Sequence, residues 1–217
     1  MPDVPVRVLL VDDYGLVRAG LRAVLDTPHI EVVGEASTGK EAIERVRELS
    51  PDIVLMDVQM PDMDGLAATE AIKAEFPSVA VVILTSFDDV AYLERAIRAG
   101  ASGYLIKVID PALLQQAVWT LCNGESLIDT KLMARLLAKM APSVPIVAGA
   151  ADDGCEALGT LEREVLKAIV NGRTNGEIAT DLHYSVGTVK NAVQRIIEKL
   201  GVSDRTQAAV YAVRHAL

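Results

Sequence analysis

The sequence has few aromatic residues, only two cysteines and no long uncharged apolar run. Phe, Trp and Tyr make up 4% of the 217 residues, so the cores have to be built from Val, Leu, Ile and Ala. Cys122 and Cys155 lack the paired spacing of a metal site, and we expect free thiols. No segment offers the roughly 20 apolar residues of a membrane span, and the N-terminus lacks the apolar core of a secretion signal. We therefore expect a globular cytoplasmic protein without a membrane partner.

The charge of −9 is distributed unevenly along the chain. Residues 1–125 contain 20 acidic and 10 basic side chains, and residues 126–157 contain four and three. Residues 158–217 reverse the balance, with six acidic and eight basic side chains. A basic surplus is what a DNA-binding segment needs, so only the C-terminal part suits nucleic acid.

The first 125 residues alternate short β-branched apolar runs with longer helical patterns. Nearly continuous Val, Ile and Leu runs are typical of strands buried on both faces of a parallel sheet. The predicted strands are 6–11, 31–36, 52–56, 79–84 and 103–106, and the predicted helices are 15–25, 39–49, 65–75, 90–99 and 111–123. Five βα units in this order predict a doubly wound, flavodoxin-like α/β fold with a five-stranded parallel sheet. On the first helix we expect Leu16, Ala19, Gly20, Ala23 and Val24 to form the apolar stripe.

The remaining residues are predicted to be helical, with a break between two parts. Residues 129–140 form an amphipathic pattern, and 141–157, rich in Pro, Gly and Ala, is typical of an interdomain linker. Four further helices are predicted at 160–171, 175–182, 186–199 and 204–215. The domain division is then 1–125, a linker region at 126–157, and an all-α four-helix domain at 158–217.

Three carboxylates are predicted to meet at one edge of the sheet. Asp12 and Asp13 follow the first strand and Asp57 ends the third, and open parallel sheets bind ligands at the carboxyl ends of their strands. Any one of these residues alone is more simply read as a loop or helix-cap residue. Like charges a few ångströms apart raise one another's pKa, so the three together favour a hard cation such as Mg²⁺.

Two other strand ends complete this set of groups. Thr85 and Ser86 follow the fourth strand and supply hydroxyl groups, and Lys107 follows the fifth and supplies an ammonium group. A carboxylate nucleophile, a divalent ion, a hydroxyl donor and a cation are the components of phosphoryl transfer to an aspartate.

The motifs LLVDDYGLVRAGL, DIVLMDVQMPDMDGL, VVILTSFDD and GASGYLIK resemble the receiver domain of two-component response regulators over nearly all of residues 5–123. The resemblance implies that Asp57 accepts a phosphoryl group from a sensor histidine kinase. It also implies that Mg²⁺ binds Asp12, Asp13, Asp57 and the backbone carbonyl of Gln59. Thr85 and Lys107 would bind the phosphoryl oxygens, and Thr85 and Tyr104 would form the switch pair, Tyr104 turning inward. Two positions depart from the family pattern, Tyr14 and Val108.

The C-terminal segment has helix-turn-helix organisation. Ser185 is a predicted N-cap for a helix whose early exposed residues, Thr188, Lys190 and Asn191, suit phosphates and base edges. The buried side of this helix is predicted to carry Val189, Val193, Ile196, Ile197 and Leu200. The pieces EREVL, NGEIA, SVGTVKN, KLGV and RTQAA resemble the LuxR-type domain of the NarL/FixJ subfamily. That resemblance implies a recognition helix within 186–199 and a dimer surface on 204–215. We assign DNA contacts to Thr188, Val189, Lys190, Asn191 and Arg195. Leu161, Gly176 and Ala192 stand where the subfamily usually has basic residues. We therefore expect the monomer to bind DNA weakly and to rely on dimerisation.

These readings predict a response regulator in which phosphorylation of Asp57 controls dimerisation, binding to an inverted repeat in double-stranded DNA, and transcription. An aspartate-based phosphatase is the first alternative, but the second acid of its DxD pair is missing at Gln59. We therefore expect no enzyme beyond self-phosphorylation and self-hydrolysis. A second alternative keeps the receiver and gives the C-terminal domain a protein or RNA partner.

Overall fold

The structure of the chain, a computed structural model, describes residues 4–86, 90–107, 111–122, 158–215 and 217. The chain divides into two compact units, Met1–Asn123 and Gly124–Leu217. The predicted helix at 129–140 and the predicted linker at 141–157 lie outside the described residues. Among the residues described, no helix combines the length and apolarity needed to cross a bilayer.

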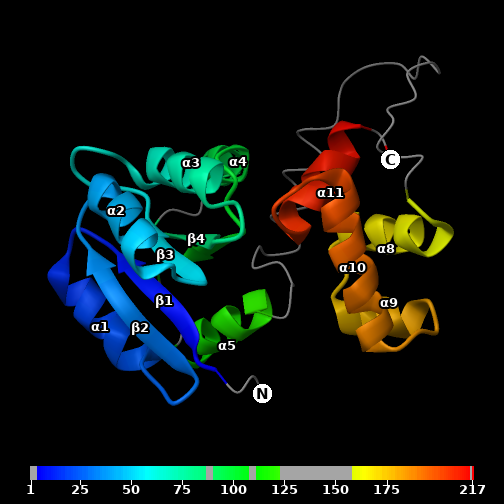
Figure 1. The fold of residues 1–217 in the computed structure, drawn as a ribbon, viewed down its shortest axis with the longest axis horizontal. Coiled ribbons are helices and arrows are strands. Elements are labelled where there is room, and N and C mark those ends of the chain that lie inside the picture. The colour runs from blue at the N-terminus through cyan, green and yellow to red at the C-terminus, as the bar shows by residue number, and fades with distance from the viewer. Residues whose placement is uncertain (1–3, 87–89, 108–110, 123–157, 216) are drawn as a thin grey trace. The chain divides into compact units, whose positions relative to one another are not determined.

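The N-terminal unit is built on a parallel five-stranded sheet, as predicted (Figure 1). Its strands are β1 (Val6–Val11), β2 (Ile30–Ala36), β3 (Ile53–Asp57), β4 (Ala80–Thr85) and β5 (Gly103–Ile106). The order is β2-β1-β3-β4-β5, the flavodoxin-like order. Since β1 pairs with both β2 and β3, strand order reverses there, and the carboxyl ends of β1 and β3 lie next to each other.

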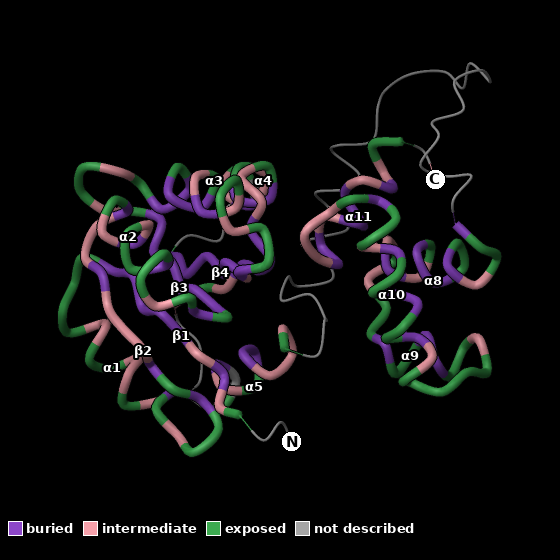
Figure 2. Tube along the Cα trace, in the orientation of Figure 1, coloured by how far each residue is buried: buried purple, intermediate pink, exposed green. Residues whose placement is uncertain are grey.

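Five helices cover the two faces of this sheet. They are α1 (Gly15–Leu25), α2 (Gly39–Leu49), α3 (Gly65–Glu75), α4 (Val90–Arg98) and α5 (Pro111–Cys122). Helix α1 packs beside α5, while α2 contacts α3 and α3 contacts α4 on the other face (Figure 1). The sheet is therefore a buried middle layer, and β3 is buried along its whole length (Figure 2).

The predicted apolar stripe of α1 is wrong except at Val24, which is partly buried. Leu16 is 87% exposed, and Ala19, Gly20 and Ala23 are not buried either. The helix also carries a second apolar stripe, which packs on the protein at Val17, Leu21, Val24 and Leu25. Two apolar stripes share one helix here, and only tertiary packing selects between them.

The C-terminal unit contains four described helices around one apolar core. They are α8 (Thr160–Val170), α9 (Asn175–Asp181), α10 (Val186–Leu200) and α11 (Arg205–Arg214). Fully buried residues of α8, α9 and α10, including Val165, Ile178 and Ile196, meet in this core (Figure 2). The predicted N-cap of α10 is confirmed, since the Ser185 hydroxyl accepts a hydrogen bond from Thr188 N at 3.1 Å.

Candidate functional site

The three predicted carboxylates meet at the carboxyl ends of β1 and β3. Asp12 and Asp57 are buried, at 1% and 6% exposure, whereas Asp13 is exposed. One carboxylate oxygen from each lies within 4.8 Å of the others. The structure therefore confirms that the three carboxylates lie close together, as the sequence predicted. The cluster forms because β1 pairs with β3.

Lys107 joins the cluster directly after β5. Its Nζ lies 2.8 Å from Asp12 Oδ2 and 2.7 Å from Asp57 Oδ1. Burial raises the pKa of Asp57, Lys107 offsets only part of this rise, and the Asp12 carboxylate adds to it. Burial opposes the charge of Lys107, but the carboxylates of Asp12 and Asp57 together outweigh it and raise the pKa of the ammonium group. Three carboxylates face this one ammonium group, so the pocket favours a further cation.

The pocket fits a hard divalent cation. Asp12 Oδ2 is buried and accepts no hydrogen bond of good geometry, although the Lys107 ammonium lies close to it. The other oxygen, Oδ1, is held by Tyr14 N at 2.9 Å, which orients the carboxylate. Carboxylate oxygens gathered in this way are the ligands that Mg²⁺ prefers, with water completing its coordination.

The remaining predicted pocket residues occupy neighbouring strand ends. Thr85 is buried at the end of β4, and its carbonyl oxygen accepts a hydrogen bond from Lys107 N at 2.7 Å. Tyr104 on β5 is also buried, at 4% exposure, so it already has the inward position that we expected for the switch. Gln59 is exposed in the loop that follows β3. The roles of these residues stay predictions.

Two supports of the pocket were not anticipated. Arg18 Nη1 donates to the Asp12 carbonyl oxygen at 2.6 Å, and Glu35 holds this arginine through its Nε at 2.9 Å. At the start of α3, Gly65 N donates to Val58 O at 2.9 Å, and a Cβ on Gly65 would overlap the Asp57 carbonyl oxygen. The signal for Gly65 was present in the sequence, as the one glycine of the MPDMDGL segment.

In the C-terminal unit, the structure separates the predicted DNA contacts into two groups. Lys190 and Asn191 are exposed and Thr188 is partly exposed at the start of α10, where they were predicted. Val189 is 0% exposed and belongs to the core, so its assignment as a DNA contact is wrong. It shares the buried stripe of α10 with Val193 and Ile196, which follow it at spacings of four and three residues.

Arg195 forms an ion pair with Glu162, a carboxylate that no sequence motif had indicated. Glu162 of α8 is 4% exposed and accepts from Arg195 Nε at 3.0 Å and Lys199 Nζ at 2.7 Å. Burial opposes its charge, but these bonds and one from Gly159 N lower the pKa of Glu162 to about 2. This ion-pair cluster joins α8 to α10, which makes Arg195 a structural residue in this unit.

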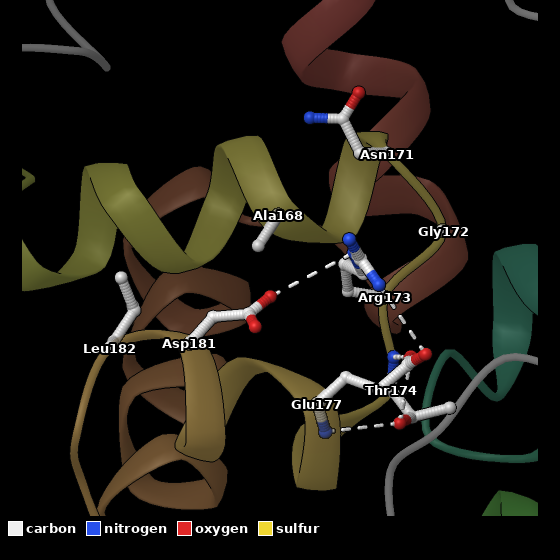
Figure 3. A pocket seen from close by; sticks show the side chains of 8 residues that line it. All are labelled: Ala168, Asn171, Gly172, Arg173, Thr174, Glu177, Asp181 and Leu182. Atoms are coloured by element: carbon white, nitrogen blue, oxygen red, sulfur yellow. Dashed lines mark hydrogen bonds and ion pairs between the residues drawn. The ribbon is translucent and has the colours of Figure 1, made fainter.

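A groove of about 670 Å³ lies between the end of α8 and α9 (Figure 3). The cation among its lining residues, Arg173, pairs with Glu177 at 3.5 Å and Asp181 at 3.8 Å. The buried Arg205 of α11 also reaches this turn, donating to Asn175 Oδ1 at 2.6 Å and to the Arg173 carbonyl oxygen. Arg173 thus connects the turn before α9 to α9 itself and to α11.

A doubly wound sheet with an acidic pocket at its carboxyl edge, followed by a helix-turn-helix unit, defines the class of receiver-containing regulators. Residues 8–119 match the family described as response regulator receiver domain, and residues 156–212 match the bacterial regulatory proteins of the luxR family. The chain belongs to the two-component response regulators that carry a receiver domain and a LuxR-type DNA-binding domain.

Individual relatives agree with this assignment. Response regulator protein VraR of Staphylococcus saprophyticus subsp. saprophyticus is 38% identical over 214 residues, covering 98% of this chain and 99% of VraR. The response regulator ChrA of a heme-sensing two-component system is 34% identical over 98% of each chain, with a TM-score of 0.51. RcsB, solved as two dimers bound to two parallel DNAs, is 26% identical over 97% of this chain and 98% of its own, with a TM-score of 0.56.

Proposed function

We propose that Asp57 accepts a phosphoryl group from a sensor histidine kinase, with Mg²⁺ bound in the pocket, and that this controls dimerisation and DNA binding. The observation that carries the proposal is the meeting of Asp57 with Asp12, Asp13 and Lys107 at the carboxyl edge of the sheet. No single one of these residues carries it, because isolated acids at strand ends also serve as caps.

Each residue has a chemical part in the transfer. An Asp57 oxygen bonds to phosphorus while the bond from phosphorus to the donor histidine nitrogen breaks, and that nitrogen keeps the electron pair. Lys107, already 2.7 Å from Asp57, neutralises charge on the phosphoryl oxygens. Asp12, Asp13, Asp57 and the Gln59 carbonyl would hold Mg²⁺, which supplies further charge neutralisation to the same oxygens. Water then hydrolyses the acyl phosphate, so the protein turns over only its own phosphoryl group.

The proposed donor and output follow from the surfaces around these sites. Tyr14 and Leu16, 67% and 87% exposed, lie one and three residues after the acidic pair and offer apolar area to the sensor histidine kinase. A phosphoryl group on Asp57 would draw in Thr85, change the packing of Tyr104 and favour a two-fold dimer. Such a dimer matches an inverted repeat in promoter DNA, with α11 as the proposed contact between output domains.

Acetyl phosphate, a small phosphodonor, is expected to add one phosphoryl group to the wild type only when Mg²⁺ is present. Asp57→Asn should show no added mass, because its side chain lacks the carboxylate nucleophile. Intact mass spectrometry on the full chain measures the adduct, and size-exclusion chromatography of the same samples measures dimerisation. Asp62→Asn is the matched control, since this exposed loop acid has a φ of 65° that asparagine tolerates. An adduct of equal yield on Asp57→Asn would contradict the proposal.

DNA binding by the phosphorylated chain is expected to weaken steeply as salt rises, because phosphate contacts release counterions. Lys190→Ala should lower affinity for all duplex sequences and reduce the slope of log K against log salt by about one. Filter binding at two or more salt concentrations measures both quantities. Lys167→Ala, an exposed lysine of α8, should leave the slope unchanged. A salt-independent affinity would favour a protein partner for this domain.

A further inference from the structure

We propose that α10 reads adenine through two side-chain amides, Asn191 and Gln194, so that the central base pairs of each half-site are A·T. The inference rests on the proposed DNA binding and adds the base preference that this particular helix would impose. Gln194 was not among the DNA contacts predicted from the sequence.

The two amides occupy the middle of the exposed face of α10. Gly187, Asn191, Gln194 and Glu198 follow one another at spacings of four, three and four residues, which places them on one stripe. All four are exposed, whereas Val189, Ala192, Val193, Ile196 and Leu200 form the opposite, buried stripe. The stripe of Asn191 and Gln194 is therefore the one that a duplex would meet if the helix enters a major groove.

The cations of α10 lie beside this stripe and not within it. Arg195 and Lys199 flank one side and are tied to Glu162 at 3.0 Å and 2.7 Å. Lys190 flanks the other side. Arginine is the most frequent reader of guanine, and the one arginine of α10 is held by α8. Lys190, on the other flank, suits a phosphate that borders the groove, so the amides are the groups of this stripe that can contact bases.

The chemistry of an amide matches the edge of adenine. A glutamine or asparagine donates to adenine N7 and accepts from the N6 amino group. Gln194 Nε2 donates one hydrogen to Glu198 Oε1 at 3.0 Å, which orients the amide and leaves its second N–H and its carbonyl oxygen for a base. One turn before Asn191, a Cβ on Gly187 would meet only Ser185 Oγ at 3.8 Å. The fold does not require a glycine there, but its small size lets the first turn approach the duplex closely.

The first experiment is selection from a random-sequence duplex library by the full chain, treated with acetyl phosphate and Mg²⁺. We expect enrichment of A·T pairs at the central positions of each half-site. Gln194→Ala and Asn191→Ala should each lose the preference at one position while retaining salt-dependent binding. Gln194→Glu, nearly identical in shape, should shift that position toward cytosine, because a carboxylate accepts from the N4 amino group. Asn171→Ala, an exposed amide at the end of α8, is the matched control.

A chemical substitution in the selected duplex identifies the contact itself. Replacing the enriched adenine by 7-deazaadenine removes the N7 acceptor and should weaken wild-type binding about tenfold. The same replacement should have little effect on the variant whose amide contacts that base, since the lost interaction is already absent.

The outcomes separate this inference from the function on which it rests. Enrichment of guanine, with sensitivity to 7-deazaguanine, or an unchanged preference in both amide variants would overturn amide reading while DNA binding stands. Absence of any duplex binding, with or without phosphorylation, would overturn the proposed output function and the inference with it.

Discussion

Gly65→Ala is expected to destabilise the N-terminal unit by about 3 kcal/mol, at the upper end of the cost of overpacking. The added Cβ would overlap the Asp57 carbonyl oxygen and lie 2.9 Å from its carbonyl carbon. Because the added Cβ clashes with backbone atoms of Asp57, the clash can be relieved only by shifting the end of β3. The Asp57 carboxylate would then leave the position in which Lys107 contacts it, so we also expect the loss of Mg²⁺-dependent phosphoryl uptake.

The single tryptophan makes this prediction measurable in the full chain. Trp119 lies in α5, so its fluorescence during urea unfolding reports on the N-terminal unit. Gly20→Ala is the matched control. Apart from its chain neighbours and its own helix backbone, this exposed glycine in α1 has no atom within 4 Å of the position that a Cβ would take, and alanine should stabilise the helix by about 0.5–1 kcal/mol. If both substitutions shifted the urea midpoint equally, close packing at Asp57 would not be the cause.

Glu162→Gln is expected to destabilise the C-terminal unit by about 2 kcal/mol at pH 7. The carboxyl has a pKa of about 2 in the folded chain and 4.5 as its ordinary value, a difference equivalent to about 3 kcal/mol. Water around Arg195 and Lys199, whose side chains are 49% and 37% exposed, reduces that figure. The stabilisation is fully present above pH 4.5 and is lost as the pH falls toward 2, so the two proteins should converge in acid.

Scanning calorimetry of the full chain between pH 7 and pH 3 tests this, provided that the transition of the C-terminal unit is followed separately. Glu164→Gln, an exposed acid two residues along α8, should change stability by less than about 0.5 kcal/mol at every pH. A difference between Glu162→Gln and the wild type that stayed constant down to pH 3 would assign the effect to packing instead of charge.

The strands and the pocket were accessible from the sequence because both depend on regular patterns. Apolar β-branched runs alternating with helical periods allow few arrangements, since parallel crossovers are almost always right-handed. Once Asp57 was placed at the end of the third strand and Asp12 after the first, the pairing of those strands brought the carboxylates together. The same reasoning placed Lys107 beside them, although only the tertiary structure shows that it forms ion pairs with both acids.

Side-chain direction was less accessible, because it depends on which neighbour a helix face meets. The stripe containing Leu16 is largely Ala and Gly, whereas the one that packs against the sheet and α5 contains Val17, Leu21 and Leu25. Val189 is an exception, because it shares the helical period of Val193 and Ile196, so the sequence already placed it on the buried side and only its assignment as a DNA contact is wrong. Arg195 had the charge of a DNA contact, and a carboxylate 33 residues earlier in the chain holds it.

The sequence by itself therefore determined the two-domain organisation, the order of the elements and the residues of the acidic pocket. These follow from periodicity and from the rule that ligands bind at the carboxyl ends of parallel strands. Only the tertiary structure decided that Gly65 packs on the Asp57 peptide and that Glu162 joins α8 to α10. The physical reason is that these are contacts across space, set by the packing of whole elements, and a local pattern of residues does not encode which element its neighbour will be.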